Sequence, residues 1–449
     1  MSFTTLAEHK RNDIADKWGF VVQPSRIHRS VYTNGDIFKR EMVNIFGSAW
    51  VFVGHESEIP NANDFVTRRF GGRPVILTRD RTGEIHVLFN RCAHKGAKVC
   101  RADRGSTKMF VCPYHAWSYN LSGRSVSVPL RDAYKHHRSS RRYNLLQVPR
   151  VTSYRGFIFG TLNSEAPEIE AYLAGVRSPF DDWIDRYDGG AIVVTGAPRY
   201  RIAANWKFVT DNQGDGYHPA YSHLSLLSMT SQRYGADRDM SYFGGSVDQS
   251  RMFAKCFDNG HFYVDQRPEM FADSAWAAQR PQPGREHYEA ELQSRYGEQE
   301  AKRLLELAVG AGMNLNIFPN LLLIGNQIQL VDPVAVDKTD VWWFATSVAD
   351  LPDEINTLRM RTQEDFPMFG EVDDVENFEA CQEGLGIVED EWVDCSRHWN
   401  SPTEVQEQDG IRALVTSDLT MRTFYREWQR LMRSEVHIDL SDQRQGENA

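Results

Sequence analysis

The segments FNRCAHKGAKVC (89–100) and FVCPYHAW (110–117) decide how this 449-residue chain is interpreted. The first contains a Cys-x-His pair, Cys92 and His94, and the second contains a Cys-x-x-His pair, Cys112 and His115. Thiolates and neutral imidazoles are both good ligands for transition metals. The two segments therefore supply a complete set of four metal ligands on two neighbouring loops.

The distribution of these ligands favours one kind of metal site over another. Structural Cys2His2 zinc sites usually take both cysteines from one segment and both histidines from the other. Here each loop supplies one ligand of each type. That arrangement suits a cluster of two irons, with the cysteines on one iron and the histidines on the other, which is the ligation of a Rieske [2Fe–2S] centre. Structural zinc is the alternative.

Composition narrows the class of protein. Lys and Arg total 51 against 61 Asp and Glu, and the net charge of -10 argues against a nucleic-acid-binding protein. Six cysteines are too few for a disulfide-built secreted scaffold, and the polar N-terminus lacks the apolar core of a signal peptide. No stretch approaches the roughly 18 apolar residues of a membrane span. We expect a soluble, cytoplasmic protein of several domains.

The texture of the chain changes along its length. Short β-rich segments separated by Gly, Asn, Asp and Pro predict an all-β module over 46–165, after an N-terminal helical segment over 1–45. Beyond it, 191–206 and 339–350 have strand character, while 286–310 and 420–436 have the period of amphipathic helices. Strands and helices in separate runs predict an α+β domain over 166–449, with which the N-terminal segment should pack.

A second group of polar residues lies in NWKFVTDNQGDGYHPAYSH (205–223). His218 and His223 would lie about 140° apart on an unbroken helix, so they can face one ion only if the helix is interrupted, and Pro219 is a plausible break. Asp215 and His218, three residues apart, can share a helical face. Taken alone, the two histidines are better interpreted as a hydrogen-bonded pair in the core than as metal ligands.

These motifs resemble those of the Rieske non-haem iron aromatic-ring-hydroxylating oxygenases, in particular their large (alpha) subunits. Gly96, Tyr114 and Trp117 surround the Rieske ligands as in that family, and 205–223 matches its NWK…N-x-x-D-x-Y-H-x4-H segment. Ala116 stands where the family commonly has Gly, a change that we expect the loop to tolerate. Asp211 stands where the family usually has Glu, and we assign it no role.

The resemblance implies a second metal centre, a mononuclear Fe(II) held by His218, His223 and one downstream Asp. Matching E-x-D-D-x-x-N in FGEVDDVENFEACQEGL (369–385) places the third ligand at Asp374, with Asp373 as the alternative. Asp215 would act as a bridge between its own His218 and a Rieske histidine of a neighbouring subunit, His115. Asp418 would lie on the other side of the same contact.

The resemblance also implies the fold and the reaction. An all-β Rieske domain would precede an α+β catalytic domain with an antiparallel sheet flanked by helices, of the helix-grip type. The activity would be cis-dihydroxylation of an aromatic ring by O2. Because the chain lacks a dinucleotide-binding fingerprint, electrons would come from NAD(P)H through a separate reductase and ferredoxin. Alternatives are a Rieske monooxygenase or dealkylase and, less favoured, an electron-transfer protein without oxygenase activity.

Assembly and substrate are further implications of the resemblance. We expect a small beta subunit in an α3β3 assembly, or an α3 homotrimer. The substrate pocket would be lined by residues that include several amides, which suggest a polar substituent on the substrate: Asn212, Gln213, Gly216, Leu227, Asn314, Ile324 and Gly370. The identity of the aromatic substrate does not follow from the sequence.

Overall fold

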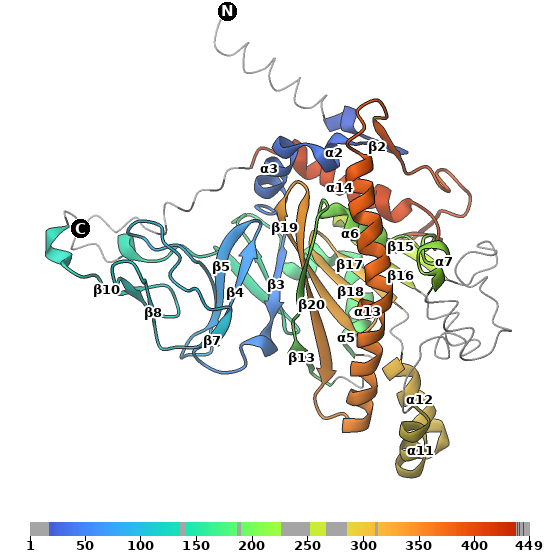
Figure 1. Ribbon diagram of the computed structural model, residues 1–449, viewed down its shortest axis with the longest axis horizontal. Coiled ribbons are helices and arrows are strands. Elements are labelled where there is room, and N and C mark those ends of the chain that lie inside the picture. Colours follow the sequence, from blue (N-terminus) through green and yellow to red (C-terminus); the bar gives the residue numbers. More distant parts are fainter. Residues whose placement is uncertain are drawn as a thin grey trace, which may run out of the picture. The chain divides into compact units, whose positions relative to one another are not determined.

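The computed structural model describes residues 18–134, 141–185, 190–225, 252–265, 285–309 and 313–436, and the single positions 438, 440 and 443 (Figure 1). The chain forms two compact units. The smaller comprises Arg40–Ile169 and the described residues after Ser434, and the larger comprises the described residues up to Lys39 and Glu170–Ser434. Leu227, one of the expected pocket residues, lies outside the described residues.

The smaller unit is made of three antiparallel sheets, with strand orders β6-β5-β4-β7, β10-β9-β8 and β11-β12-β3. The strands are β3 Val51–His55, β4 Asp64–Phe70, β5 Arg73–Arg79, β6 Ile85–Phe89, β7 Arg104–Ser106, β8 Phe110–Val111, β9 Ser118–Tyr119, β10 Ser125–Ser127, β11 Arg150–Tyr154 and β12 Phe157–Thr161. One cysteine–histidine loop joins β6 to β7 and the other joins β8 to β9. Strands on both sides therefore fix each loop.

The larger unit is centred on a ten-stranded antiparallel sheet of order β13-β20-β19-β18-β17-β16-β15-β23-β22, with β14 also paired to β20. Its strands are β13 Ile192–Gly196, β14 Arg199–Ile202, β15 Phe253–Cys256, β16 Phe262–Asp265, β17 Met313–Ile317, β18 Leu321–Ile324, β19 Gln327–Ala335, β20 Lys338–Val348, β22 Val405–Glu407 and β23 Gly410–Leu414. A separate three-stranded sheet pairs β1 Val22–Gln23, β2 Arg26–His28 and β21 Trp392–Asp394.

Helices complete the larger unit. They are α2 Ser30–Thr33, α4 Ile169–Leu173, α5 Arg177–Asp185, α6 Lys207–Gln213, α7 Pro219–Ser222, α11 Arg285–Tyr296, α12 Glu298–Val309, α13 Asp353–Gly384 and α14 Leu419–Arg433, while α3 Gly35–Asn44 spans the boundary between the two units in the chain. The 32-residue α13 lies across the sheet (Figure 1), where it accepts hydrogen bonds from Gln327 of β19 and Tyr200 of β14.

The predicted fold class, α+β with a separate all-β domain, is confirmed. Two local expectations change. The segment 286–310 forms two helices rather than one, because Gly297 adopts a φ of 81° between them. Within the predicted N-terminal helical segment over 1–45, α3 begins at Gly35 and ends at Asn44. The helices of the described segments lack an apolar stretch of membrane-spanning length.

Candidate metal centres

The two cysteine loops of the smaller unit contain the same type of backbone turn. The carbonyl oxygen of Cys92 accepts a hydrogen bond from Gly96 N at 3.1 Å, and that of Cys112 accepts one from Ala116 N at 3.0 Å. Gly96 has a φ of 80° and Ala116 a φ of 58°, so both turns close in the left-handed region. Glycine reaches that region freely, whereas a side chain with a Cβ is strained there. Ala116, which stands where the family commonly has Gly, therefore has a strained backbone.

The four predicted cluster ligands lie together. Cys92 and Cys112 are buried, and their thiols are in hydrogen-bond contact. His94 Nδ1 lies 3.1 Å from His115 Nδ1, and both imidazoles are half-buried. Two buried sulfurs and two ring nitrogens that converge near the surface form the donor set that a [2Fe–2S] cluster with mixed ligands requires. The residues fit the group.

The surroundings favour the ligand form of His94, whereas burial raises the pKa of the Cys92 thiol. Burial, followed by the nearby His115 and Lys95, lowers the pKa of His94, so the neutral imidazole is preferred. The Tyr119 hydroxyl lies 3.2 Å from Cys92 Sγ, where it can donate to a thiolate. The indole of Trp117 stacks on His94 with the ring centroids 4.9 Å apart and the planes at 6°. Trp117 thereby fixes the orientation of the His94 ring.

In the larger unit, His218 and His223 flank the four-residue helix α7. His218 is the N-cap, Pro219 is the first helical residue, and His223 is the C-cap. Proline is favoured at that first position because its missing N–H would have no helical partner there. The imidazole centroids are 5.3 Å apart. The sequence required a break in the helix if both histidines were to face one ion. That break is present, because α6 ends at Gln213 and a separate short helix begins at Pro219.

Asp374 of α13 completes a three-residue group with these histidines. Its Oδ1 lies 3.6 Å from His218 Nε2 and 3.4 Å from His223 Nε2, and all three atoms lie within 4.8 Å of one another. Asp374 is 2% exposed, and its Oδ1 has no hydrogen-bond partner in the described part of the chain. Asp373 instead approaches the other ring nitrogen of His223, with Oδ2 3.3 Å from Nδ1.

The electrostatics of this group suit a bound cation. Burial, and then the charge of Glu371, raises the pKa of Asp374 to about 9, while burial and then His223 lower the pKa of His218 to about 3. Without a cation the site therefore favours a protonated carboxyl group beside neutral imidazoles. Two histidines and one carboxylate with open positions are the donor set of non-haem Fe(II) enzymes, so the residues fit this metal as well.

Asp215 lies between the histidine pair and an arginine. Its Oδ2 is 3.9 Å from His218 Nδ1, which is longer than a hydrogen bond, and its Oδ1 accepts from Arg397 Nη2 at 3.2 Å. The same Nη2 donates to Asp418 Oδ1 at 2.6 Å. One guanidinium therefore links the two carboxylates that the family resemblance had placed at a subunit contact.

The sequence did not predict the contacts of several residues near the iron group, although it placed Asn212 in the substrate pocket. Asn212 hydrogen bonds with the carboxyl group of Asp374, and the Tyr200 hydroxyl donates to the buried Glu371, one helical turn before it. Asp211 is half-buried, and its Oδ2 accepts from the hydroxyls of Tyr32 at 2.8 Å and Tyr425 at 3.0 Å. The sequence signal for Asp211 was its position, where the family usually has Glu, and that signal gave it no role.

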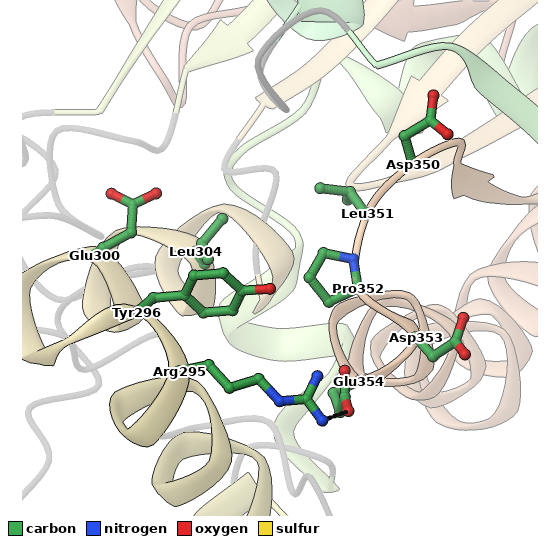
Figure 2. Close-up of a pocket in the computed structure, with 9 residues that line it drawn as sticks. All are labelled: Arg295, Tyr296, Glu300, Leu304, Asp350, Leu351, Pro352, Asp353 and Glu354. Atoms are coloured by element: carbon green, nitrogen blue, oxygen red, sulfur yellow. Dashed lines mark ion pairs between the residues drawn. The ribbon is translucent and has the colours of Figure 1, made fainter.

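Figure 2 shows a pocket elsewhere in the larger unit. Its volume is about 710 Å³, and it is lined by residues of α11, α12, the connection from β20 to α13 and the first turn of α13: Arg295, Tyr296, Glu300, Leu304, Asp350, Leu351, Pro352, Asp353 and Glu354. An ion pair of 2.8 Å joins Arg295 to Glu354. None of the predicted ligands lines this pocket, so it is separate from both candidate metal centres.

Comparison with known proteins identifies both parts of the chain. Residues 49–149 match the Rieske [2Fe-2S] domain, and residues 190–434 match the catalytic domain of the ring hydroxylating alpha subunit. The chain belongs to the ring-hydroxylating alpha-subunit family. Members combine a Rieske cluster with a mononuclear non-haem iron and act as the terminal oxygenase of multicomponent systems. This ring-hydroxylating alpha subunit is therefore an oxidoreductase of the dioxygenase type that works with a ferredoxin or reductase.

Three relatives cover most of this alpha subunit. The 2-halobenzoate 1,2-dioxygenase large subunit of Burkholderia cepacia is 32% identical over 87% of this chain and 84% of its own. The anthranilate 1,2-dioxygenase large subunit of Acinetobacter baylyi is 33% identical over 91% and 89%. The N,N-dimethyl phenylurea N-demethylase alpha subunit of a Sphingobium strain is 32% identical over 96% of both. Rhodococcus naphthalene 1,2-dioxygenase bound to indole shares the fold, with a TM-score of 0.71, 26% identity and coverage of 95% and 97%.

Proposed function

We propose that this alpha subunit cis-dihydroxylates a substituted benzene ring at an iron held by His218, His223 and Asp374. The observation that carries the proposal is the convergence of three ligand atoms within 4.8 Å, one of them a buried carboxylate oxygen without a hydrogen-bond partner. We further propose that Cys92, His94, Cys112 and His115 hold the Rieske cluster. When bound, the iron supplies dioxygen activation and the cluster supplies electrons one at a time.

The residues around the iron ligands have positioning roles in this proposal. Asp373 accepts a hydrogen bond from Nδ1 of His223, which leaves the Nε2 lone pair directed toward Asp374. Asn212 holds the Asp374 carboxyl group from α6. Arg397 orients Asp215 beside Nδ1 of His218. Small shifts of Asp215 would bring it into hydrogen-bond range of this ring nitrogen.

Asp215 is also proposed to be the link between the two metal centres. The family resemblance implies a head-to-tail trimer, with or without a small beta subunit. In that trimer, His115 of a neighbouring subunit would lie next to Asp215. Burial raises the pKa of Asp215, and Arg397 opposes that effect by stabilising the carboxylate. An ionised Asp215 can accept hydrogen bonds from two imidazoles at once, which is how a carboxylate couples two metal ligands.

The substrate is proposed to be a monocyclic aromatic compound, because the relatives named above for halobenzoate and anthranilate act on single rings. N-dealkylation is the second candidate, and the phenylurea N-demethylase relative, which spans 96% of both chains, supports it. Oxidation of an N-methyl group inserts one oxygen atom and releases the other as water, whereas cis-dihydroxylation inserts both, but each reaction needs a carbon of the substrate next to the same iron. The same residues can therefore serve either reaction.

Product analysis tests the proposal. The alpha subunit, with a beta subunit where one is required, is combined with a ferredoxin, its reductase and NADH, and supplied with 18O2 and a panel of aromatic compounds. Dihydroxylation gives a cis-dihydrodiol with two labelled oxygens, whereas N-dealkylation releases formaldehyde. Metal analysis should give about three irons per chain, since the cluster holds two. Two irons and no labelled product would contradict the proposal.

We also propose the domain limits and the cellular location. The extent of the smaller unit supports a Rieske domain over 46–165. The larger unit supports the proposed catalytic domain over 166–449 as far as Ser434, whereas the described residues after Ser434 belong to the smaller unit. The described residues before Arg40 belong to the larger unit, which supports packing of the segment 1–45 with the catalytic domain. Membership in this enzyme family supports a cytoplasmic location.

A further inference from the structure

One row of side chains crosses the central sheet of the larger unit. The strand register places Phe262 of β16 opposite Asn316 of β17, and Asn316 opposite Leu322 of β18. Leu322 in turn lies opposite Gln329 of β19, which lies opposite Trp343 of β20. Directly paired residues of antiparallel strands share a face of the sheet. All five side chains therefore project from the same face.

Hydrogen bonds show which face this is. Gln327 lies two positions before Gln329 on β19, so its side chain projects from the same face, and its Nε2 donates to the carbonyl of Gln363 in α13 at 2.9 Å. Tyr200 is paired with Val341, two positions from Trp343 on β20, and its hydroxyl donates to Glu371 of α13. The row thus lies under α13, the helix that carries Asp374.

The opposite end of the row reaches the other ligand-bearing segment. A Cβ added to Gly214, the C-cap of α6, would lie 2.9 Å from Cε2 of Phe262, so the phenyl ring touches the chain four residues before His218. The row therefore crosses the part of the sheet between α6 and α13. The two histidines of the iron group follow α6 in the chain, and Asp374 lies within α13.

Two polar side chains of this row have unused hydrogen-bonding atoms. Gln329 is 1% exposed, and neither its Oε1 nor its Nε2 has a partner among the described residues. Asn316 is fully buried; its Nδ2 donates to the Gly260 carbonyl at 3.3 Å, while its Oδ1 has no partner there. Buried polar groups are almost always hydrogen-bonded, and an unpaired one is unfavourable. The two amides call for a ligand that both donates and accepts hydrogen bonds.

We propose that Gln329 and Asn316 bind a neutral polar substituent of the aromatic substrate, such as a carboxamide or a urea. Gln329 can donate from Nε2 to the carbonyl oxygen of that group, and Oε1 of Gln329 or Oδ1 of Asn316 can accept from its N–H. Phe262 and Leu322, in the same row, offer apolar surface to the ring. None of the five residues of the row is charged, so a carboxylate substituent would have no opposite charge there. This assignment rests on the proposed oxygenase function.

The test compares three ligands of nearly the same shape: benzamide, benzoate and α-methylstyrene. Their dissociation constants are measured by calorimetry on the iron-loaded holoenzyme without O2, in the wild type and in Gln329→Leu. The loss of one hydrogen-bonding partner from a site built to hold it should weaken benzamide binding about tenfold to a hundredfold. Binding of α-methylstyrene should stay within about twofold, because Leu keeps the apolar volume. The wild type should prefer benzamide to benzoate.

Two further variants complete the test. Gln329→Met repeats the loss of the amide with an unbranched side chain, and Gln406→Leu makes the same chemical change at an exposed position on β22 and should bind all three ligands as the wild type does. Equal losses for benzamide and α-methylstyrene, no loss for either, or tighter binding of benzoate would overturn the assignment. Binding is read without turnover, so a wild type that binds benzamide selectively but oxidises no aromatic compound would refute the proposed function alone.

Discussion

Asp374 and His223 approach each other through Oδ1 and Nε2 at 3.4 Å, although one lies in the middle of α13 and the other at the end of α7. Asp373, the preceding residue, lies at the other nitrogen of the same imidazole, with its Oδ2 3.3 Å from Nδ1 of His223. A proton on Nδ1 directed at Asp373 leaves the Nε2 lone pair for a cation. Two consecutive carboxylates therefore approach the two different nitrogens of one histidine.

This difference predicts the effect of each substitution on metal content. Asp374→Ala should lose the mononuclear iron and keep the visible spectrum of the Rieske cluster, because only the former site loses a ligand. Asp373→Ala should retain the iron with an affinity about 10- to 100-fold lower, as expected when a residue that orients a ligand is removed. Metal analysis after dialysis separates the two. Iron that remains in Asp374→Ala and leaves in Asp373→Ala would reverse the assignment.

Asp215→Asn should reduce turnover at least a hundredfold while both metal centres stay loaded. The amide keeps the shape of the side chain, but it is neutral and offers one acceptor oxygen where the carboxylate offers two. The measurement is oxygen consumption together with metal content, and rapid-mixing oxidation of the reduced cluster locates the block. The link through Asp215 would be wrong if the cluster in this variant were reoxidised at the wild-type rate in the presence of substrate.

Ala116→Gly should stabilise the smaller unit. Ala116 has a φ of 58°, where an L side chain costs about 1–2 kcal/mol, and the larger freedom of Gly in the unfolded chain returns about 0.5–1 kcal/mol of that. The net gain should be about 0.5–1 kcal/mol, visible as a higher midpoint for thermal loss of the cluster spectrum. Gly83→Ala, at a φ of 91° in the turn between β5 and β6, should show the reverse. A lower midpoint for Ala116→Gly would contradict the strain.

Asp211 should make stability depend on pH. Burial raises its pKa from 3.8 to about 7, so between these values the folded state keeps a proton that the unfolded state has lost. Stability should therefore fall as pH rises toward 7 and level off above it. Asp211→Asn does not titrate, and its stability relative to wild type should rise by about 2 kcal/mol from pH 5.5 to 7. Urea denaturation measures the difference, and parallel pH profiles would refute the prediction.

The charge around the two cysteine loops predicts how the electron donor docks. Eight basic side chains and one acidic side chain lie between positions 91 and 131, and all eight basic ones are exposed: Arg91, Lys95, Lys98, Arg101, Arg104, Lys108, Arg124 and Arg131. The whole chain, in contrast, has a net charge of -10. A positive surface attracts an acidic partner, and salt weakens that attraction.

Charge reversal tests this docking. The double variant Lys98→Glu and Arg101→Glu should slow ferredoxin-supported turnover several-fold at low salt and should lose the decline of the rate with added salt. Lys338→Glu, an exposed lysine on β20, serves as the control and should behave as the wild type. Equal salt dependence in the double variant and the control would show that these charges do not guide the donor.

The sequence determined the local groups of ligands. Cys92 and His94, Cys112 and His115, and His218 and His223 are each separated by four residues or fewer, so the backbone of one short segment fixes their distance. The two classes of structure were also readable, because short strands and amphipathic helices have different periods. Family motifs then indicated the carboxylate segment 369–385, but the spacing alone did not distinguish Asp373 from Asp374.

Only the tertiary structure decided what long-range packing controls. Successive residues of a helix point about 100° apart, so the way α13 lies on the sheet determines which carboxylate meets both Nε2 atoms. Asp211 finds its hydroxyl partners, Tyr32 and Tyr425, on helices at the two ends of the chain. Gln329 reaches the face under α13 because strand pairing sets its register. Such contacts depend on the relative placement of distant elements, which local spacing does not encode.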